Sequence, residues 1–425
     1  MNVTVFPGSA RGAVTILPSK SQLHRLLICA ALAEGNTTIY AGHTEAEDVA
    51  ATIDCLSALG AEIVRQEEAF LVIPLRRDRL PARAVLPCRE SGSTFRFMLP
   101  LVCALGVSGT FQLSGRLPER PLSPLEAALV QQGIHLSRPT PDTLCAEGQL
   151  LPGTYRLPGN ISSQFITGLL FALPLLEGES SLAIEGPRES EDYIALTLET
   201  LALFGQGPTP TRDGYHIRGG GPFRSPGVAV AEGDWSNAAF WLAAGAMPGG
   251  QIQVRGLNPE SRQGDKDVCA ILARMGAHIQ WAGNIVTVSA GHLRGTEIDA
   301  SAIPDLVPVL SAVAAVSEGT TRIRNAVRLR LKESDRLKAT AETLNALGAR
   351  VTEEAEGLVI SGLPRLRGGL ADAWGDHRIA MTAAVASTAA EDPVNITGAQ
   401  AVNKSYPDFW ALLKTLDKQV HIEEE

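Results

Sequence analysis

Six short polar motifs stand directly before six apolar stretches of the sequence, at positions where helices are expected to begin. The motifs are PSKSQLHR, ESGSTFR, NISSQF, EGDWSNAAF, IPDLVP and GDHRIA. Their serines and aspartates suit a helix N-cap or first turn, namely Ser21, Ser93, Ser163, Ser236 and Asp305. Capping accounts for these residues, but it does not account for the cations beside them.

Lysine and arginine crowd these expected helix starts, at Lys20, Arg25, Arg96 and Arg378. A cation there opposes the positive end of the helix dipole and costs about 0.3–1 kcal/mol. A bound anion offsets this cost, because the cation and the backbone N–H groups of the helix end both attract it. The pattern therefore predicts anion binding at the starts of several helices.

Ser21 and Arg25 are four residues apart and are expected to share one helix face. Lys332 and Arg336 repeat this spacing inside RLKESDRLK, where an exposed, salt-bridged helix face explains the segment equally well. Two separate anions, at least one of them a phosphate, would account for this number of cations. The candidate proton carriers are Asp305, Glu333, Asp376 and His377.

A repeat in the chain indicates the elements that must position these residues. The phrase Leu-x-x-Leu-Gly-Ala occurs at Gly60 and at Gly348, with looser copies at Gly133, Gly205 and Gly276 and with Asp417 in the sixth place. The steps are 73, 72, 71, 72 and 69 residues. Each copy follows an apolar helix, a turn, a strand and an amphipathic helix.

Units of about 70 residues are marginal alone, so three units packing their apolar helices together is the expected arrangement. We expect two such assemblies in the chain, with a hinge near Ser225–Asp234. The N-terminal strand, Asn2–Phe6, could complete either half.

Composition narrows the class of protein. Of 425 residues, 45% are hydrophobic and 20% are charged, which is ordinary for a globular protein. Acidic residues outnumber basic ones by 46 to 37, so general binding of nucleic acid or anionic membranes is not expected. Six scattered cysteines, no signal peptide and no stretch long enough to span a bilayer lead us to expect a cytoplasmic protein with reduced thiols.

The motifs PSKSQLHR, ESGSTFR, LPERPL, ISSQF, EGDWS, IPD, LKESDR, GDHRIA and NKSYPD occur in this order over essentially the whole chain. This set resembles the enolpyruvyltransferase family, and within it the EPSP synthases (3-phosphoshikimate 1-carboxyvinyltransferases). The resemblance implies an α/β fold, an inverse α/β barrel or prism, with six βαβαββ repeats, three in each of two domains. It implies a first domain of residues 19–230 and a discontinuous second domain of residues 1–18 plus 231–425. The active site is expected in the cleft between them, which closes on the substrates.

The resemblance also implies the reaction. The enolpyruvyl group of phosphoenolpyruvate is transferred to the 5-hydroxyl of shikimate 3-phosphate and phosphate is released, in the shikimate pathway to chorismate and aromatic amino acids. Addition gives a tetrahedral ketal, which then expels phosphate. No metal or organic cofactor is implied, and the enzyme is expected to be a monomer.

Site residues follow from the same resemblance. Asp305 is expected to take the proton of the 5-hydroxyl, and Glu333 or Lys20 to deliver one to the methylene carbon of phosphoenolpyruvate. Tyr193 is expected to support Ser190. Shikimate 3-phosphate is assigned to Lys20, Ser21, Arg25, Ser162, Ser163, Gln164, Ser190, Asp305 and Lys332. Phosphoenolpyruvate is assigned to Lys20, Gly92, Arg120, Gln164, Arg336, Arg378 and Lys404.

Two departures from the family pattern lie near Gly92. Glu90 stands where an asparagine is usual, and it is expected to point away or to pair with an arginine. Phe97 stands where a proline is common.

Two alternatives remain open. One is the sister enzyme that acts on UDP-N-acetylglucosamine, but Ser21 replaces its asparagine after the lysine. In addition, the loop GRLPERPLSP at residues 115–124, which we call the Arg120 loop, lacks its cysteine. The other is a non-catalytic relative that binds phosphorylated ligands or RNA, which the net charge of −9 disfavours.

Overall fold

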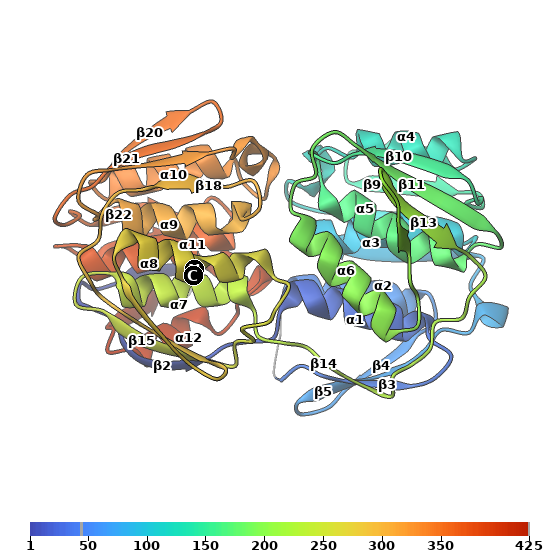
Figure 1. Ribbon diagram of the computed structural model, residues 1–425, viewed down its shortest axis with the longest axis horizontal. Coiled ribbons are helices and arrows are strands. Elements are labelled where there is room, and N and C mark those ends of the chain that lie inside the picture. The colour runs from blue at the N-terminus through green and yellow to red at the C-terminus, as the bar shows by residue number, and fades with distance from the viewer. Residues whose placement is uncertain (43–45, 424–425) are drawn as a thin grey trace. The chain divides into compact units, whose positions relative to one another are not determined.

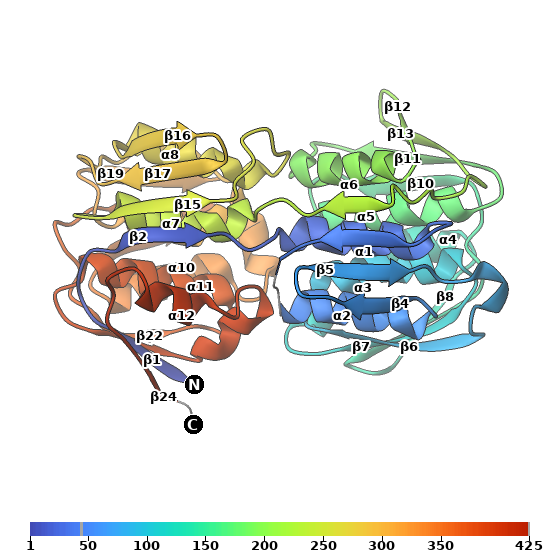
Figure 2. The same cartoon turned by 90° about the horizontal axis from the view of Figure 1, so that it is seen from below.

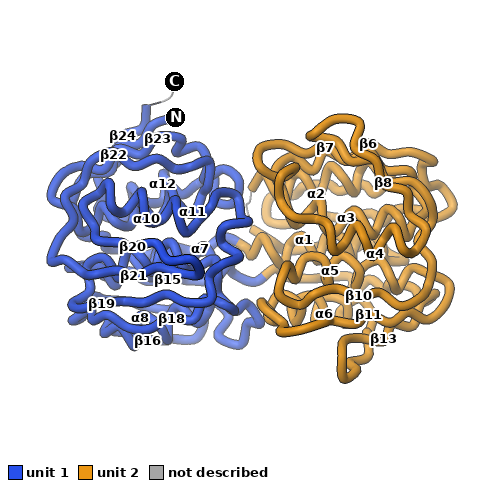
Figure 3. The backbone as a smooth tube through the Cα atoms, turned by 90° about the horizontal axis from the view of Figure 1, so that it is seen from above, with its two compact units in different colours: residues 1–17, 232–425 blue, residues 18–231 orange. Residues whose placement is uncertain are grey.

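The computed structural model describes residues 1–42 and 46–423. These form two compact units, shown in different colours in Figure 3. We call residues 18–231 the continuous unit, and residues 1–17 with 232–425 the discontinuous unit. Each unit has a hydrophobic core of its own.

Three apolar helices form the centre of the continuous unit (Figure 1). They are α1 (Lys20–Leu32), α3 (Gly92–Ala104) and α5 (Ser163–Ala172). Nearly all their residues are buried, because these helices have no continuous polar face to turn toward water. The amphipathic helices of this unit are α2 (Glu47–Ala58), α4 (Ser123–Gln131) and α6 (Glu191–Leu203).

The discontinuous unit repeats this plan. Its apolar helices are α7 (Trp235–Ala246), α9 (Val307–Ala314) and α11 (His377–Ala386), which pack against one another. Its other helices are α8 (Val268–Met275), α10 (Arg336–Ala346) and α12 (Phe409–Lys414).

In the described part of the chain, six four-stranded sheets surround these helices, and all six have the same pairing. An edge strand runs parallel to its neighbour, and the two strands beyond are antiparallel. The continuous unit contains β3 (Thr37–Tyr40), β4 (Glu62–Arg65), β5 (Ala69–Ile73), β6 (Arg83–Arg89), β7 (Ser108–Leu113), β8 (His135–Thr140), β9 (Thr143–Glu147), β10 (Thr154–Pro158), β11 (Glu179–Glu185), β12 (Thr209–Pro210), β13 (Gly214–Arg218) and β14 (Val228–Val230).

The remaining strands form the three sheets of the discontinuous unit with the same pairing. They are β1 (Asn2–Val5), β2 (Arg11–Thr15), β15 (Gln251–Arg255), β16 (His278–Ala282), β17 (Ile285–Ser289), β18 (Glu297–Asp299), β19 (Thr320–Arg324), β20 (Arg350–Glu354), β21 (Gly357–Ser361), β22 (Gly369–Asp372), β23 (Val394–Thr397) and β24 (Val420–Glu423). The predicted α/β class is therefore confirmed.

The N-terminal strands settle a question that the sequence left open. Strand β1 lies between β23 and β24, and β2 runs parallel to β15, so both complete sheets of the discontinuous unit (Figure 2). In exchange, β14 runs parallel to β3 in the continuous unit. The edge strands β2 and β14 thus each pair in one unit, while the apolar helix that follows each of them in the chain, α1 or α7, belongs to the other unit.

The glycines of the repeat have a conformational reason. Gly60, Gly133, Gly205, Gly276 and Gly348 all have left-handed backbone angles, with φ between 76° and 107°. These positions follow helix ends, where glycine adopts the left-handed conformation without a steric penalty. Asp417 takes the same conformation at φ 55°, which explains how it fills the sixth place.

Among the described residues, no helix combines the length and the apolar character that crossing a bilayer requires.

Candidate active site

The helix starts of the continuous unit are capped one or two residues before the expected serines. Ser19, Ser91 and Ser162 are the N-caps of α1, α3 and α5, and each side chain accepts a bond from a backbone N–H of the first turn. Ser21 and Ser93 consequently lie in the first turn, where their hydroxyls do not serve as caps. The side chains of these first turns can therefore take part in other contacts.

Two cations at the start of α1 have defined partners. Lys20 Nζ lies 2.7 Å from Asp48 Oδ2 at the start of α2. The Arg25 guanidinium donates to the Thr197 hydroxyl at 2.9 Å, to the Tyr193 carbonyl at 2.9 Å and to the Ser21 carbonyl at 2.6 Å. Burial lowers the pKa of Arg25 to about 10, so this cation stays charged near neutral pH.

Ser190 lies at the N-terminus of α6, close to the Arg25 contacts. It is buried and has left-handed backbone angles, φ 54° and ψ 45°, which strain a serine. The N–H of Tyr193 donates to the Ser190 carbonyl at 3.1 Å, while the Tyr193 carbonyl accepts from Arg25. The Tyr193 backbone therefore links two of the residues assigned to shikimate 3-phosphate.

Gly92, the first residue of α3, has the Arg120 guanidinium against it. A Cβ at Gly92 would lie 2.8 Å from Arg120 Nη1, so any larger residue here would displace the Arg120 guanidinium. Gln164 in α5 donates to Ser93 Oγ at 2.9 Å. The Glu90 side chain packs over Gly115, where a Cβ would lie 2.3 Å from its carboxylate oxygen.

Asp305 lies in the middle of a cluster of charged side chains in the discontinuous unit. It lies in the short 3₁₀ helix η5 (Pro304–Leu306) that precedes α9. Its carboxylate is 2.7 Å from Arg336 Nη1, 3.3 Å from Arg378 Nη2 and 3.4 Å from Lys332 Nζ. Burial alone would raise the pKa of Asp305, but these three cations outweigh burial and hold it well below the ordinary carboxyl value.

Arg336 joins three carboxylates. Besides Asp305, it donates to Glu333 Oε2 at 2.6 Å and to Asp376 Oδ2 at 2.7 Å. Asp376 also accepts from the Ser334 hydroxyl at 3.0 Å and caps α11 through the N–H of Arg378. Both oxygens of Asp376 therefore accept hydrogen bonds, and this carboxylate anchors Arg336.

The spacing of Lys332 and Arg336 predicted one continuous helix, and this was wrong. Lys332 follows the 3₁₀ helix η6 (Val327–Leu331), and α10 begins only at Arg336. Asp335 is the N-cap of α10, because its side chain accepts a hydrogen bond from the Lys338 N–H. Lys332 and Glu333 therefore lie in the short segment between η6 and α10, and Lys332 still reaches Asp305.

Lys404, the last residue of η8 (Ala399–Lys404), is buried.

Three polar residues of these clusters were missed by sequence reasoning. Asp48 and Thr197 are partners of Lys20 and Arg25, but they lie 28 and 172 residues away along the chain. Asp265, in η4 (Gly264–Asp267), is buried and accepts a hydrogen bond from the Ser236 hydroxyl. Burial, together with the nearby charge of Asp305, raises the pKa of Asp265 above the ordinary carboxyl value.

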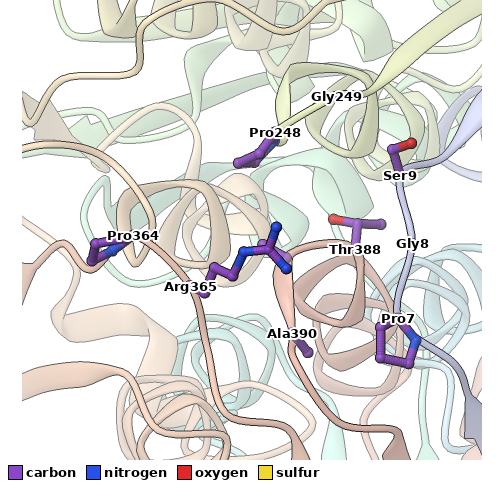
Figure 4. Close-up of a pocket in the computed structure, with 10 residues that line it drawn as sticks. Pro7, Gly8, Ser9, Pro248, Gly249, Pro364, Arg365, Thr388 and Ala390 are labelled. Carbon is purple, nitrogen blue, oxygen red and sulfur yellow. The ribbon is translucent and has the colours of Figure 1, made fainter.

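A pocket of about 380 Å³ lies elsewhere in the discontinuous unit (Figure 4). Its lining includes Pro248 and Gly249 after α7, and Thr388 after α11. It therefore lies near the C-terminal ends of these helices, whereas Ser236 and Arg378 lie at their N-terminal ends. None of the predicted site residues lines this pocket, and we assign it no part in the reaction.

Comparison with known proteins connects these clusters to a family. A profile of the family described as EPSP synthase (3-phosphoshikimate 1-carboxyvinyltransferase) matches residues 6–413. The 3-phosphoshikimate 1-carboxyvinyltransferases of Clostridium acetobutylicum and Clostridium kluyveri are 42% and 41% identical to the chain, over 99% and 98% of it and 98% of each relative.

Solved structures agree with the sequence relatives. An EPSP synthase structure from Acinetobacter baumannii has a TM-score of 0.80 at 25% identity, covering 99% of this chain and 100% of that chain. An enolpyruvyl transferase from Streptomyces tendae shares the fold at a TM-score of 0.78 and 20% identity, covering 99% of this chain and 98% of that chain. The chain belongs to the EPSP synthase family, the 3-phosphoshikimate 1-carboxyvinyltransferases.

Proposed function

We propose that this chain transfers the enolpyruvyl group of phosphoenolpyruvate to the 5-hydroxyl of shikimate 3-phosphate, and that the clusters described above perform the transfer. Family membership favours this reaction over transfer to UDP-N-acetylglucosamine and over a non-catalytic binding role. The observation that carries the proposal is Asp305, an ionised carboxylate surrounded by three cations at a helix start.

Shikimate 3-phosphate is assigned mainly to the continuous unit. Arg25 supports this assignment, because three donated bonds fix its guanidinium and burial leaves it charged in a low-dielectric setting. A phosphate would stabilise such a cation strongly. The other proposed contacts are Lys20, Ser21, Ser162, Ser163, Gln164, Ser190, Asp305 and Lys332.

Phosphoenolpyruvate is assigned to a set of cations that includes Arg120 and Arg336. Arg120, which lies against Gly92 at the start of α3, supports the assignment, since a helix start and a guanidinium both attract an anion. Arg336 must give up one of its carboxylate partners to bind the substrate, and Asp305 and Glu333 are the more exposed of the three. The other proposed contacts are Lys20, Gln164, Arg378 and Lys404.

In the proposed mechanism Asp305 accepts the proton of the 5-hydroxyl as the new C–O bond forms at phosphoenolpyruvate. Glu333 or Lys20 adds a proton to the methylene carbon, and the resulting tetrahedral ketal loses a proton from that carbon and expels phosphate. A carboxylate with so low a pKa is a weak base. Bound substrate anions would compete for Arg336, Arg378 and Lys332, and this would raise the pKa of Asp305 toward the range that catalysis needs.

An assay of phosphate release, with each substrate omitted in turn, tests the reaction. We expect release only when both substrates are present, and we expect Asp305→Asn to lower kcat by about 10²–10⁴-fold. Thermal stabilisation by UDP-N-acetylglucosamine or RNA, but not by shikimate 3-phosphate, would contradict the proposal. If Asp305→Asn kept more than about a tenth of the activity, another group would be the base.

We also propose that the enzyme acts as a monomer in the cytoplasm, where its six cysteines, all free thiols, would stay reduced. Light scattering after size-exclusion chromatography should give the mass of one chain, and a dimer mass would contradict this.

A further inference from the structure

Arg96 is a buried cation of α3 to which the reaction above assigns no part. Only 5% of the residue is exposed, and its guanidinium lies 5.3 Å from the centroid of the Phe165 ring. A buried arginine on an aromatic face is held in one orientation and has directed donors. Its remaining contacts therefore indicate what it holds in place.

One terminal nitrogen of Arg96 fixes the amide of Gln164. Arg96 Nη1 donates to Gln164 Oε1 at 2.6 Å, while Gln164 Nε2 donates to Ser93 Oγ at 2.9 Å. An amide whose oxygen accepts one bond and whose nitrogen donates another cannot turn over without losing both. Arg96 thus determines which way this amide faces.

The other terminal nitrogen holds the loop that carries Arg120. Arg96 Nη2 donates to the carbonyl of Pro121 at 3.1 Å, directly after Arg120 in the chain. The Arg120 guanidinium in turn lies against Gly92. One side chain therefore connects α3, α5 and the Arg120 loop.

The backbone of α5 comes close enough to permit these contacts. A Cβ at Gly168 would lie 2.3 Å from the Arg96 carbonyl oxygen, so only glycine allows α5 to approach α3 this closely. The approach brings Gln164 and Phe165, in the first turn of α5, to the side chain of Arg96.

We propose that Arg96 is a positioning residue for phosphoenolpyruvate, which holds Gln164 and the Arg120 loop in the geometry that binds this substrate. The inference rests on the proposed assignment of Gln164 and Arg120 to phosphoenolpyruvate. Both functions of Arg96 need two directed donors on one planar group, which a lysine ammonium does not supply. Arg96→Lys should therefore behave almost as Arg96→Met does, although it keeps the charge.

The first experiment measures kcat and both KM values for Arg96→Met and Arg96→Lys. We expect each variant to raise the KM for phosphoenolpyruvate by about tenfold or more. The KM for shikimate 3-phosphate should rise by a smaller factor, because only Gln164 of the two groups that Arg96 holds is also assigned to that substrate. The matched control is Arg156→Met, since Arg156 is an exposed arginine of the same unit, paired with Glu185. If Arg96→Lys kept the wild-type KM for phosphoenolpyruvate, a charge alone would suffice and the proposal would be wrong.

The second experiment is a pair of double-mutant cycles, Arg96→Met with Gln164→Ala and with Arg120→Ala. If Arg96 acts through these residues, its effect on the KM for phosphoenolpyruvate should shrink at least about threefold in each background. Fully additive effects would mean that Arg96 acts independently, and would overturn the proposal. If Gln164→Ala and Arg120→Ala themselves left phosphoenolpyruvate binding unchanged, the site assignment would fail before Arg96 is considered.

Discussion

At the scale of single residues, the charge state of Asp305 is set by its three cationic neighbours, and this gives a pH dependence of stability. Its pKa in the folded protein lies well below the value of about 3.9 expected in the unfolded chain. Its contribution to stability is therefore present above that unfolded value and is lost as the pH falls through the folded one.

We expect Asp305→Asn to lower Tm at pH 7, because three cations lose their shared anion. The difference in Tm from wild type should narrow as the pH falls below about 4, where the Asp305 carboxyl of the unfolded chain begins to take up a proton while that of the folded protein is still ionised. Calorimetric scans between pH 3 and 7 measure it. A difference that stays constant over this range would show that Asp305 is not held ionised by its neighbours.

Phe97 offers a second test at this scale, on the cation assigned to shikimate 3-phosphate. Its ring centroid lies 5.3 Å from the Arg25 guanidinium and 5.6 Å from the Phe171 ring centroid. Phe97→Leu removes the aromatic face from beneath Arg25, which is worth about 0.5–2 kcal/mol. Titration calorimetry should show shikimate 3-phosphate binding weakened by about 2–30-fold.

Phe171→Leu is the control, since Phe171 is a buried ring of the same cluster. It should lower stability similarly and leave the affinity for shikimate 3-phosphate within about twofold. Equal losses of affinity in both variants would assign the effect to core packing and not to the cation–π contact.

At the scale of helices, the close contact of α3 and α5 depends on Gly168. A Cβ there would lie 2.3 Å from the backbone oxygen of Arg96, so the helices must separate to admit it. Gly168→Ala should destabilise the protein by about 1–3 kcal/mol. It should also raise the KM for phosphoenolpyruvate, because Gln164 moves with α5.

Gly207→Ala is the matched control, since a Cβ at Gly207 meets nothing within 4 Å. Urea denaturation should place this control within about 0.5 kcal/mol of wild type. A Gly168→Ala variant as stable as the control would show that the two helices do not need the contact.

At the scale of the whole molecule, one sheet pairs the first strand in chain order, β1, with the last, β24, as antiparallel neighbours. Strand β1 pairs with β24 in antiparallel register, with Asn2 opposite Glu423. In the other five sheets, the two corresponding strands are consecutive in the chain. The discontinuous unit is therefore a complete set of three sheets only when residues 1–17 are supplied.

We expect a fragment of residues 18–231 to unfold cooperatively, since it holds three complete sheets and its own core. Residues 232–425 alone should not, because β23 and β24 lose the strand between them. Adding residues 1–17 after residue 425 through a short linker should restore cooperative unfolding, measured by circular dichroism. Cooperative unfolding of 232–425 without this addition would contradict the expectation.

Local regularities determined much of this protein from the sequence alone. The six-fold repeat was visible because each copy needs a left-handed residue after its amphipathic helix, which glycine supplies at Gly60 and Gly348 and Asp417 at the last copy. The apolar helices were visible because a fully buried helix has no polar face to interrupt its sequence. The family, and with it the reaction, followed from polar motifs that capping alone did not explain.

The tertiary structure decided what depends on residues far apart in the chain. The sheet that takes β1 could not be predicted, because β1 pairs with strands about 400 residues away. The helix expected over Lys332 and Arg336 was wrong because Asp335 caps α10 and Arg336 binds Asp305 and Asp376, 31 and 40 residues away. Likewise, sequence marks Arg96 as a cation at a helix start, but only the packing of α5 against α3 brings it to Gln164. Spacing along a chain predicts a shared helix face, whereas the partner of a charge is fixed by how separate elements pack.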